Sequence, residues 1–128
     1  MDTVGLARPP SKSALIHTER HEWLAYRLVS AIHEECNGIG AKLVVLLCPN
    51  LADLYTTDQR FREHFVAYLR NQRMLFVDLG KEFIDRNLDV PELCLSDEHL
   101  SPAGHAITAE ILYQYLRKTG LGPNAAGR

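Results

Sequence analysis

The 128-residue sequence lacks an excess of charge of either sign. Fourteen Lys and Arg residues stand against 16 Asp and Glu residues, which leaves a formal net charge of −2. A protein that holds nucleic acid or an anionic membrane by electrostatics needs a basic surface, and this composition gives no reason to expect one. We therefore expect no nucleic acid and no membrane among the partners.

Long apolar runs and paired cysteines are also missing. No stretch approaches the roughly 18 to 20 apolar residues of a membrane span, and residues 1–13 lack the apolar core of a secretory signal. The three cysteines, Cys36, Cys48 and Cys94, are an odd number with no C-x-x-C pair. We expect all three to be reduced, with Cys48 buried at the end of an apolar run, and the chain as written to be cytoplasmic.

The composition that is present fits one α/β domain. Hydrophobic residues make up 46% and charged residues 23% of the chain, which is ordinary for a globular protein of this size. Prolines, serines and glycine near the start predict a flexible arm over residues 1–13. The ordered domain is expected over residues 14–119, followed by a flexible tail over residues 120–128.

Apolar periodicity predicts three main helices and two strands. Spacings of three and four from Ala14 to Cys36 predict an amphipathic helix that stops at Asn37-Gly38. A second helix is expected between Asp58 and Asn71. The last helix should begin at the cap Ser101 and end near Gly120.

The two strands are the apolar runs Ala41–Cys48 and Met74–Gly80, and a short helical turn is expected after the second. The strand, helix, strand order predicts parallel pairing with the middle helix as crossover. The nearly unbroken apolarity of Leu43–Cys48 predicts a strand covered on both faces. Two strands make a poor sheet, so this pattern implies sheet neighbours that the sequence does not obviously supply.

The stretch LSDEHLSPAGHAITAEILYQYL, residues 95–116, contains an aspartate two residues before a histidine at the mouth of the last helix. A helix, the segment Gly38–Val45 leading into Pro49, a second helix and the strand Leu75–Leu79 precede the motif Asp97–Ser101, which is followed by Gly104-His105. In this order they resemble the C-terminal half of SGNH/GDSL-type ester hydrolases. The resemblance extends from Ala14 to Lys118 in order and content.

That resemblance implies a three-layer α/β sandwich with a parallel sheet, of which this chain would be the C-terminal portion. It also implies a Ser-His-Asp triad in which His99 is the general base and Asp97 orients it. An imidazole that titrates near neutrality can take a hydroxyl proton, and a carboxylate can fix its tautomer. Many family members have the spacing D-x-x-H, whereas this chain has D-x-H. Asn50, just past the first strand, lies where α/β sheets bind ligands, although Pro49-Asn50 is equally a plain turn.

The family's nucleophile and oxyanion donors have no counterpart in this chain. It contains neither the G-D-S motif nor the G-x-N-D motif, and none of its five serines is a convincing nucleophile. The sequence is therefore interpreted as part of a longer ester hydrolase or O-acyl transferase, or as a degenerate descendant. If completed, it would act on an O-acylated small molecule or glycan, and no cofactor is expected.

Several residues have structural interpretations that compete with these. Asp97 and His99 could form a solvated turn, and the whole chain could be a non-catalytic interaction module that associates through an exposed sheet edge. His17 and His21 share a helix face but lack the third ligand and the H-E-x-x-H order of a zinc site. Asp78 fits a helix cap as well as an active site. We expect Gly104 to permit close packing and His105 to have no catalytic role.

Overall fold

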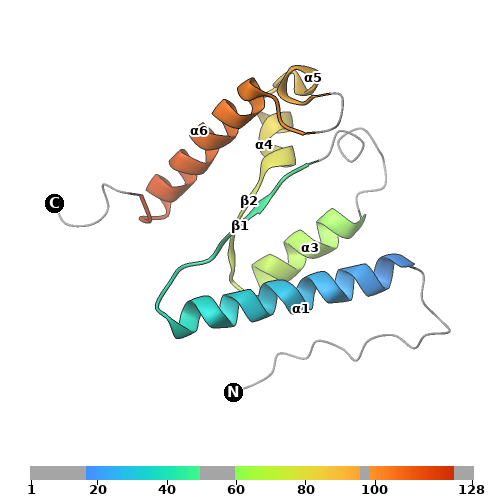
Figure 1. Cartoon of the computed structure of the whole chain (residues 1–128), viewed down its shortest axis with the longest axis vertical. Helices are drawn as coiled ribbons and strands as arrows, with labels where there is room; N and C mark the ends of the chain where they lie inside the picture. Colours follow the sequence, from blue (N-terminus) through green and yellow to red (C-terminus); the bar gives the residue numbers. More distant parts are fainter. Residues whose placement is uncertain (1–16, 50–59, 96–98, 123–128) are drawn as a thin grey trace. The chain divides into compact units, whose positions relative to one another are not determined.

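The computed structural model describes residues 17–49, 60–95 and 99–122. These residues form helices α1 (His17–Gly38), α3 (Arg60–Asn71), α4 (Leu79–Asp85), α5 (Val90–Leu93) and α6 (Pro102–Lys118), and strands β1 (Val44–Leu47) and β2 (Leu75–Asp78) (Figure 1). The chain divides into two compact units. The first comprises residues 1–45 and 59–75, and the second comprises residues 46–58 and 76–128.

The strands β1 and β2 pair in a two-stranded parallel sheet, as the sequence predicts. Helix α3 lies between them in the chain and forms the crossover. All four residues of β1 are half-buried, so the predicted burial on both faces is not observed. The physical reason is that β1 has only β2 as a partner in the described part of the sheet, whereas full burial needs neighbours on both sides and both faces.

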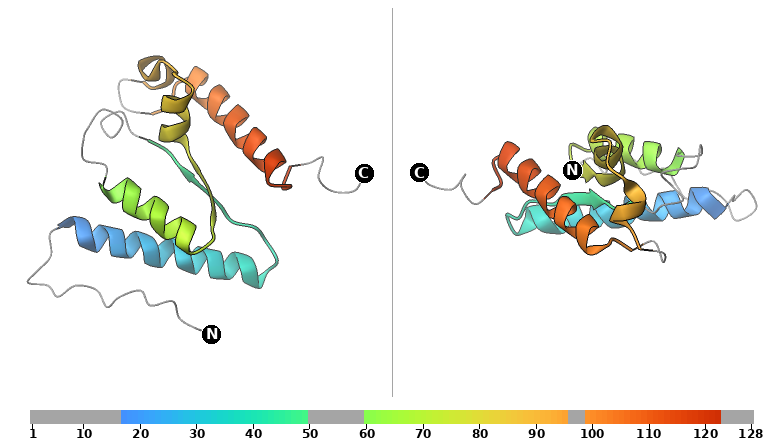
Figure 2. Two further views of the ribbon diagram at one scale, coloured as in Figure 1. Left: turned by 180° about the vertical axis from the view of Figure 1, so that it is seen from behind. Right: turned by 90° about the horizontal axis from the view of Figure 1, so that it is seen from above.

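Helices α1 and α3 pack through aromatic side chains in the first unit. Tyr26 of α1 stacks on Phe65 and Tyr68 of α3, with ring centroids 5.8 and 4.4 Å apart. Tyr68 also donates its hydroxyl hydrogen to the Tyr26 carbonyl oxygen at 3.4 Å. Leu69, on the same face of α3, is fully buried. Figure 1 shows the two helices side by side, and the views in Figure 2 agree.

A polar contact accompanies this packing. Glu22 Oε1 lies 2.8 Å from His64 Nδ1 and accepts a hydrogen bond from the Tyr26 hydroxyl at 3.3 Å. Burial, followed by the Glu22 charge, raises the pKa of Tyr26 to about 12, because both factors disfavour the phenolate. Glu22 and Tyr26 therefore define the face of α1 that is directed at α3.

The second unit is built around α6, which contacts α4 and α5. Its core contains Leu79 and Phe83 of α4, both fully buried, together with Leu93 and Ile111. The predicted short helical turn after β2 is observed as α4. Helix α5 was not predicted from the sequence, because a single turn that contains proline gives no periodic signal.

The structure corrects the prediction that Cys48 is buried. Cys36, Cys48 and Cys94 form no disulfide bond, but Cys94 is the buried one and Cys48 is exposed. Cys48 follows β1, which ends at Leu47, so its side chain is no longer covered by the sheet.

Among the described residues, no helix has the length and apolarity needed to cross a membrane.

Candidate functional site

The loop between α5 and α6 carries the histidine of the predicted site. The Leu95 N–H donates to the His99 carbonyl oxygen at 2.6 Å, and Cys94 and Leu100 form an isolated antiparallel bridge. These contacts bring the two ends of the loop together over three intervening residues. The His99 carbonyl group and the backbone of the two residues that follow it are therefore held by hydrogen bonds to the segment at α5.

Ser101 ties this loop to both neighbouring helices. Its N–H donates to the Leu93 carbonyl oxygen at 2.9 Å, and its hydroxyl donates to the Glu92 carbonyl oxygen at 2.8 Å. The same hydroxyl oxygen accepts from the Gly104 N–H at 3.1 Å, which caps α6. The sequence predicts the cap, but the two bonds to the segment around α5 follow only from the tertiary structure. Pro102, at the first helical position, lacks the N–H that a cap would otherwise have to satisfy.

Gly104 permits the close approach of α6 to the loop, as expected. A Cβ atom at this position would overlap the carbonyl oxygen of Leu93 and lie 3.2 Å from Leu100 Cδ2. No side chain larger than hydrogen fits there without movement of the backbone. The glycine thus sets the distance between α6 and the two ends of the His99 loop.

His99 itself is exposed and directly precedes the bridge residue Leu100. An exposed imidazole on an anchored backbone can take a proton from a hydroxyl group and return it to a leaving group. Asp97 and Asn50 lie outside the described residues. Their roles as orienting carboxylate and as part of a ligand-binding edge therefore remain predictions.

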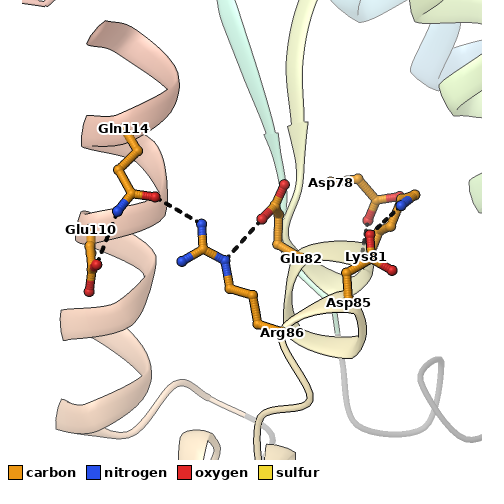
Figure 3. A network of polar contacts seen from close by, with 7 residues as sticks. All are labelled: Asp78, Lys81, Glu82, Asp85, Arg86, Glu110 and Gln114. Carbon is orange, nitrogen blue, oxygen red and sulfur yellow. Dashed lines mark hydrogen bonds and ion pairs between the residues drawn. The ribbon is translucent and has the colours of Figure 1, made fainter. Parts of the chain in front are cut away.

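Asp78 acts as the cap of α4. Its Oδ1 accepts from the Lys81 N–H at 3.2 Å, and the backbone changes from strand to helix directly after it. The Lys81 side chain forms an ion pair with Asp85, one turn further along α4 (Figure 3). The hydrogen bond within this pair raises the pKa of Lys81. The carboxylate at the end of β2 thus has a structural role in ending the strand, which the sequence offered as one of two interpretations.

A hollow of about 260 Å³ lies between α4 and α6. It is lined by Val77, Glu82, Arg86, Ile111, Gln114, Tyr115 and Lys118. The Arg86 Nε lies 3.1 Å from Glu82 Oε2, and its Nη2 donates to Gln114 Oε1 at 3.0 Å (Figure 3). Gln114 in turn donates to Glu110 Oε1 at 3.1 Å.

These groups largely satisfy one another, so we interpret the network as a clamp between the end of α4 and α6. This network was not predicted from the sequence. The pairs within each helix, spaced four apart, are visible in the sequence, but Arg86 and Gln114 are 28 residues apart and no local signal joins them.

Two other histidines, His17 and His105, were also singled out from the sequence. His105 is exposed in the first turn of α6. The side chain of His17 lies outside the described residues. Across residues 17–49, 60–95 and 99–122, no group of three or more His, Cys, Asp or Glu side chains is arranged to hold a metal ion.

Comparison with known proteins gives no relative from which a function could be transferred. The chain matches no protein-family model, no curated protein and no solved structure.

Proposed function

We propose that this chain is the C-terminal part of an SGNH/GDSL-type serine ester hydrolase or O-acyl transferase. His99 is the general base, and Asp97 orients its ring. The observation that carries the proposal is the backbone of the α5–α6 loop. It presents an exposed imidazole directly ahead of a capped helix and anchors both ends of the loop by hydrogen bonds.

The chemistry assigns a separate task to each group. His99 takes the proton from a seryl hydroxyl as that oxygen attacks the ester carbonyl, and it returns the proton to the departing alcohol. Asp97 holds the ring in one tautomer and stabilises the imidazolium. Because the sequence has no G-D-S motif, the serine is supplied by another segment. The substrate is an O-acylated small molecule or glycan, and the reaction needs no cofactor.

The anchoring of the two ends of the loop matters for this role. A general base must stay within hydrogen-bond distance of the hydroxyl that it activates, and small misplacements reduce the rate strongly. Ser101 and Gly104 fix the backbone next to His99 from the side of α6, and Leu93 fixes it from the side of α5.

The first experiment measures hydrolysis of p-nitrophenyl acetate by the 128-residue chain. We expect no turnover above that of a His99→Ala variant, because no serine is placed for His99 to activate. Turnover that is lost in both Ser96→Ala and His99→Ala would show that the nucleophile lies within this chain, and it would overturn the assignment of the serine to another segment.

The second experiment extends the chain with the in-frame coding sequence upstream of Met1. The proposal requires a G-D-S segment there, and a coding sequence without one would contradict it. The extended protein should hydrolyse the ester, and His99→Ala should reduce kcat by about 10³-fold or more. His105→Ala is the matched control, because it changes a nearby exposed imidazole, and it should leave kcat within about twofold of the wild type. Equal losses in the two variants would refute the role of His99.

The alternative function, a non-catalytic interaction module, is favoured by one observation. Three large aliphatic side chains of α1 are about half exposed.

A further inference from the structure

Helix α1 presents a row of apolar side chains away from α3. Leu24, Leu28 and Ile32 keep exposed fractions of 47, 56 and 51%. Leu24 and Leu28 each lie two residues from Tyr26, a step of roughly 200° around a helix, so both are nearly opposite the face that is directed at α3. Ile32 lies six residues from Tyr26 and is therefore roughly 120° from it, toward the side of the helix. The row runs along about two turns of the helix.

Such a row is unusual on the surface of a monomer. Single exposed aliphatic residues are common, but aligned large ones mark contact surfaces. Their spacing of four residues creates the ridge that helices use when they pack on one another. The exposed row is therefore suited to a second helix of the same kind.

The charges beside the row indicate which helix that is. Exposed Arg20 lies near the start of α1, whereas exposed Glu34 and Glu35 lie near its end. Arg27 is near the middle of the helix, where it is placed over the Trp23 ring, 5.9 Å from its centroid, and it belongs to neither end. Among the exposed side chains that the structure describes on α1, the end near Arg20 is thus basic and the end near Glu34 and Glu35 is acidic.

We propose that α1 binds α1 of a second copy of this chain in antiparallel orientation, with the two-fold axis at Leu28. Leu24 of each copy then packs on Ile32 of the other, and the two Leu28 side chains meet at the axis. In this arrangement the basic end of each helix lies beside the acidic end of its partner. A parallel pair would instead bring like charges together at both ends.

This association goes beyond the proposed hydrolase function and does not depend on it. It uses the first unit of the chain, whereas His99 belongs to the second. Three half-exposed aliphatic residues per copy make a small interface, so the dimer should be weak, with a Kd between about 10 and 500 μM.

Sedimentation equilibrium of the full chain tests the association. The molar mass should rise from 14.5 kDa toward twice that value as the concentration increases. Leu28→Glu, which sets two carboxylates against each other at the axis, should raise Kd at least about tenfold. Ile84→Glu is the matched control, since Ile84 is 54% exposed but lies on α4, and its Kd should equal that of the wild type.

Charge reversal tests the orientation. The variants Arg20→Glu and Glu34→Arg/Glu35→Arg should each dimerise more weakly than the wild type, because each alters one charged end. A mixture of the two should recover association, since acidic residues then face basic ones again. Raising the salt concentration from about 0.05 to 0.5 M should weaken the wild-type dimer about threefold, because screening removes the attraction between the ends.

Three results would overturn the proposal. A molar mass that stays at 14.5 kDa up to about 1 mM excludes the dimer. A dimer that is indifferent to Leu28→Glu is formed by another surface. A dimer that salt strengthens has the like-charged ends together, which contradicts the antiparallel arrangement. Circular dichroism on each variant, with the wild-type spectrum as reference, separates lost association from lost folding.

Discussion

Replacing Gly104 with alanine tests the packing that holds α6 against the His99 loop. A Gly to Ala change within a helix normally stabilises it by about 1 kcal/mol. At this position the new methyl group would overlap the Leu93 carbonyl oxygen, which is a backbone atom and cannot rotate away. That oxygen also accepts a hydrogen bond from the Ser101 N–H. The helix must therefore shift, and the contact network must loosen.

The magnitude follows from the balance of these effects. Overpacking costs about 1 to 3 kcal/mol, and weakening the Ser101 hydrogen bond adds about 1 kcal/mol. The steric conflict is with rigid backbone, so the upper part of the overpacking range applies. After subtraction of the gain in helix propensity, Gly104→Ala should lower the free energy of unfolding by about 2 to 3 kcal/mol.

Urea denaturation followed by circular dichroism at 222 nm, the usual helix signal, measures this change. Gly38→Ala is the control, because Gly38 ends α1 and has no atom within 4 Å of the added methyl group. Its free energy of unfolding should stay equal or rise by up to about 1 kcal/mol. A Gly104→Ala variant as stable as Gly38→Ala would refute the argument from close approach.

Two further predictions concern the cap of α6 and the contact between α1 and α3. Ser101→Ala should lower the free energy of unfolding by about 1 to 2 kcal/mol, because it leaves the Gly104 N–H without its acceptor, whereas Thr119→Ala at the exposed end of α6 should change it by less than about 0.5 kcal/mol. Equal effects in the same urea assay would contradict the anchoring role of Ser101. Between pH 10 and 12 the wild type should lose more stability than Tyr26→Phe, because the unfolded phenol ionises near its ordinary pKa of 10.0 while the folded one stays protonated up to about 12. Unfolding free energies measured across this interval check the sign, and parallel pH profiles of the two proteins would show that Tyr26 contributes nothing.

The predicted helices agree best with the structure where capping signals are strong. The cap at Ser101, Pro102 at the first helical position and the positive φ of Gly120 define α6 as the sequence indicates. The strands were predicted in the right places but too long. β2 ends at Asp78 rather than Gly80, because the Asp78 side chain caps α4 and thereby starts the helix early.

Only part of the candidate site could be predicted from the sequence. His99 and the cap at Ser101 lie two residues apart in one motif, so the local sequence is sufficient to identify both. The anchoring of the loop to Leu93 and Glu92 depends on how α5 meets the start of α6, and α5 has no sequence signal of its own. The burial of Cys94 rather than Cys48 has the same origin, since coverage by a distant segment decides it.

The sequence by itself determined the order of all the described helices and strands except α5, and it determined the cap of α6 and the amphipathic faces. These features depend on residues within one or two turns of each other, where backbone geometry and side-chain type suffice. The parallel pairing was predicted from the strand, helix, strand order, because such units are joined by crossovers. The tertiary structure alone decided which faces are covered. It placed Glu22 beside His64, 42 residues away, and Arg86 beside Gln114, and it left Leu24, Leu28 and Ile32 exposed. Burial and polar contact depend on segments that are distant in the chain, so a local pattern shows that a helix has an apolar face but not what covers it.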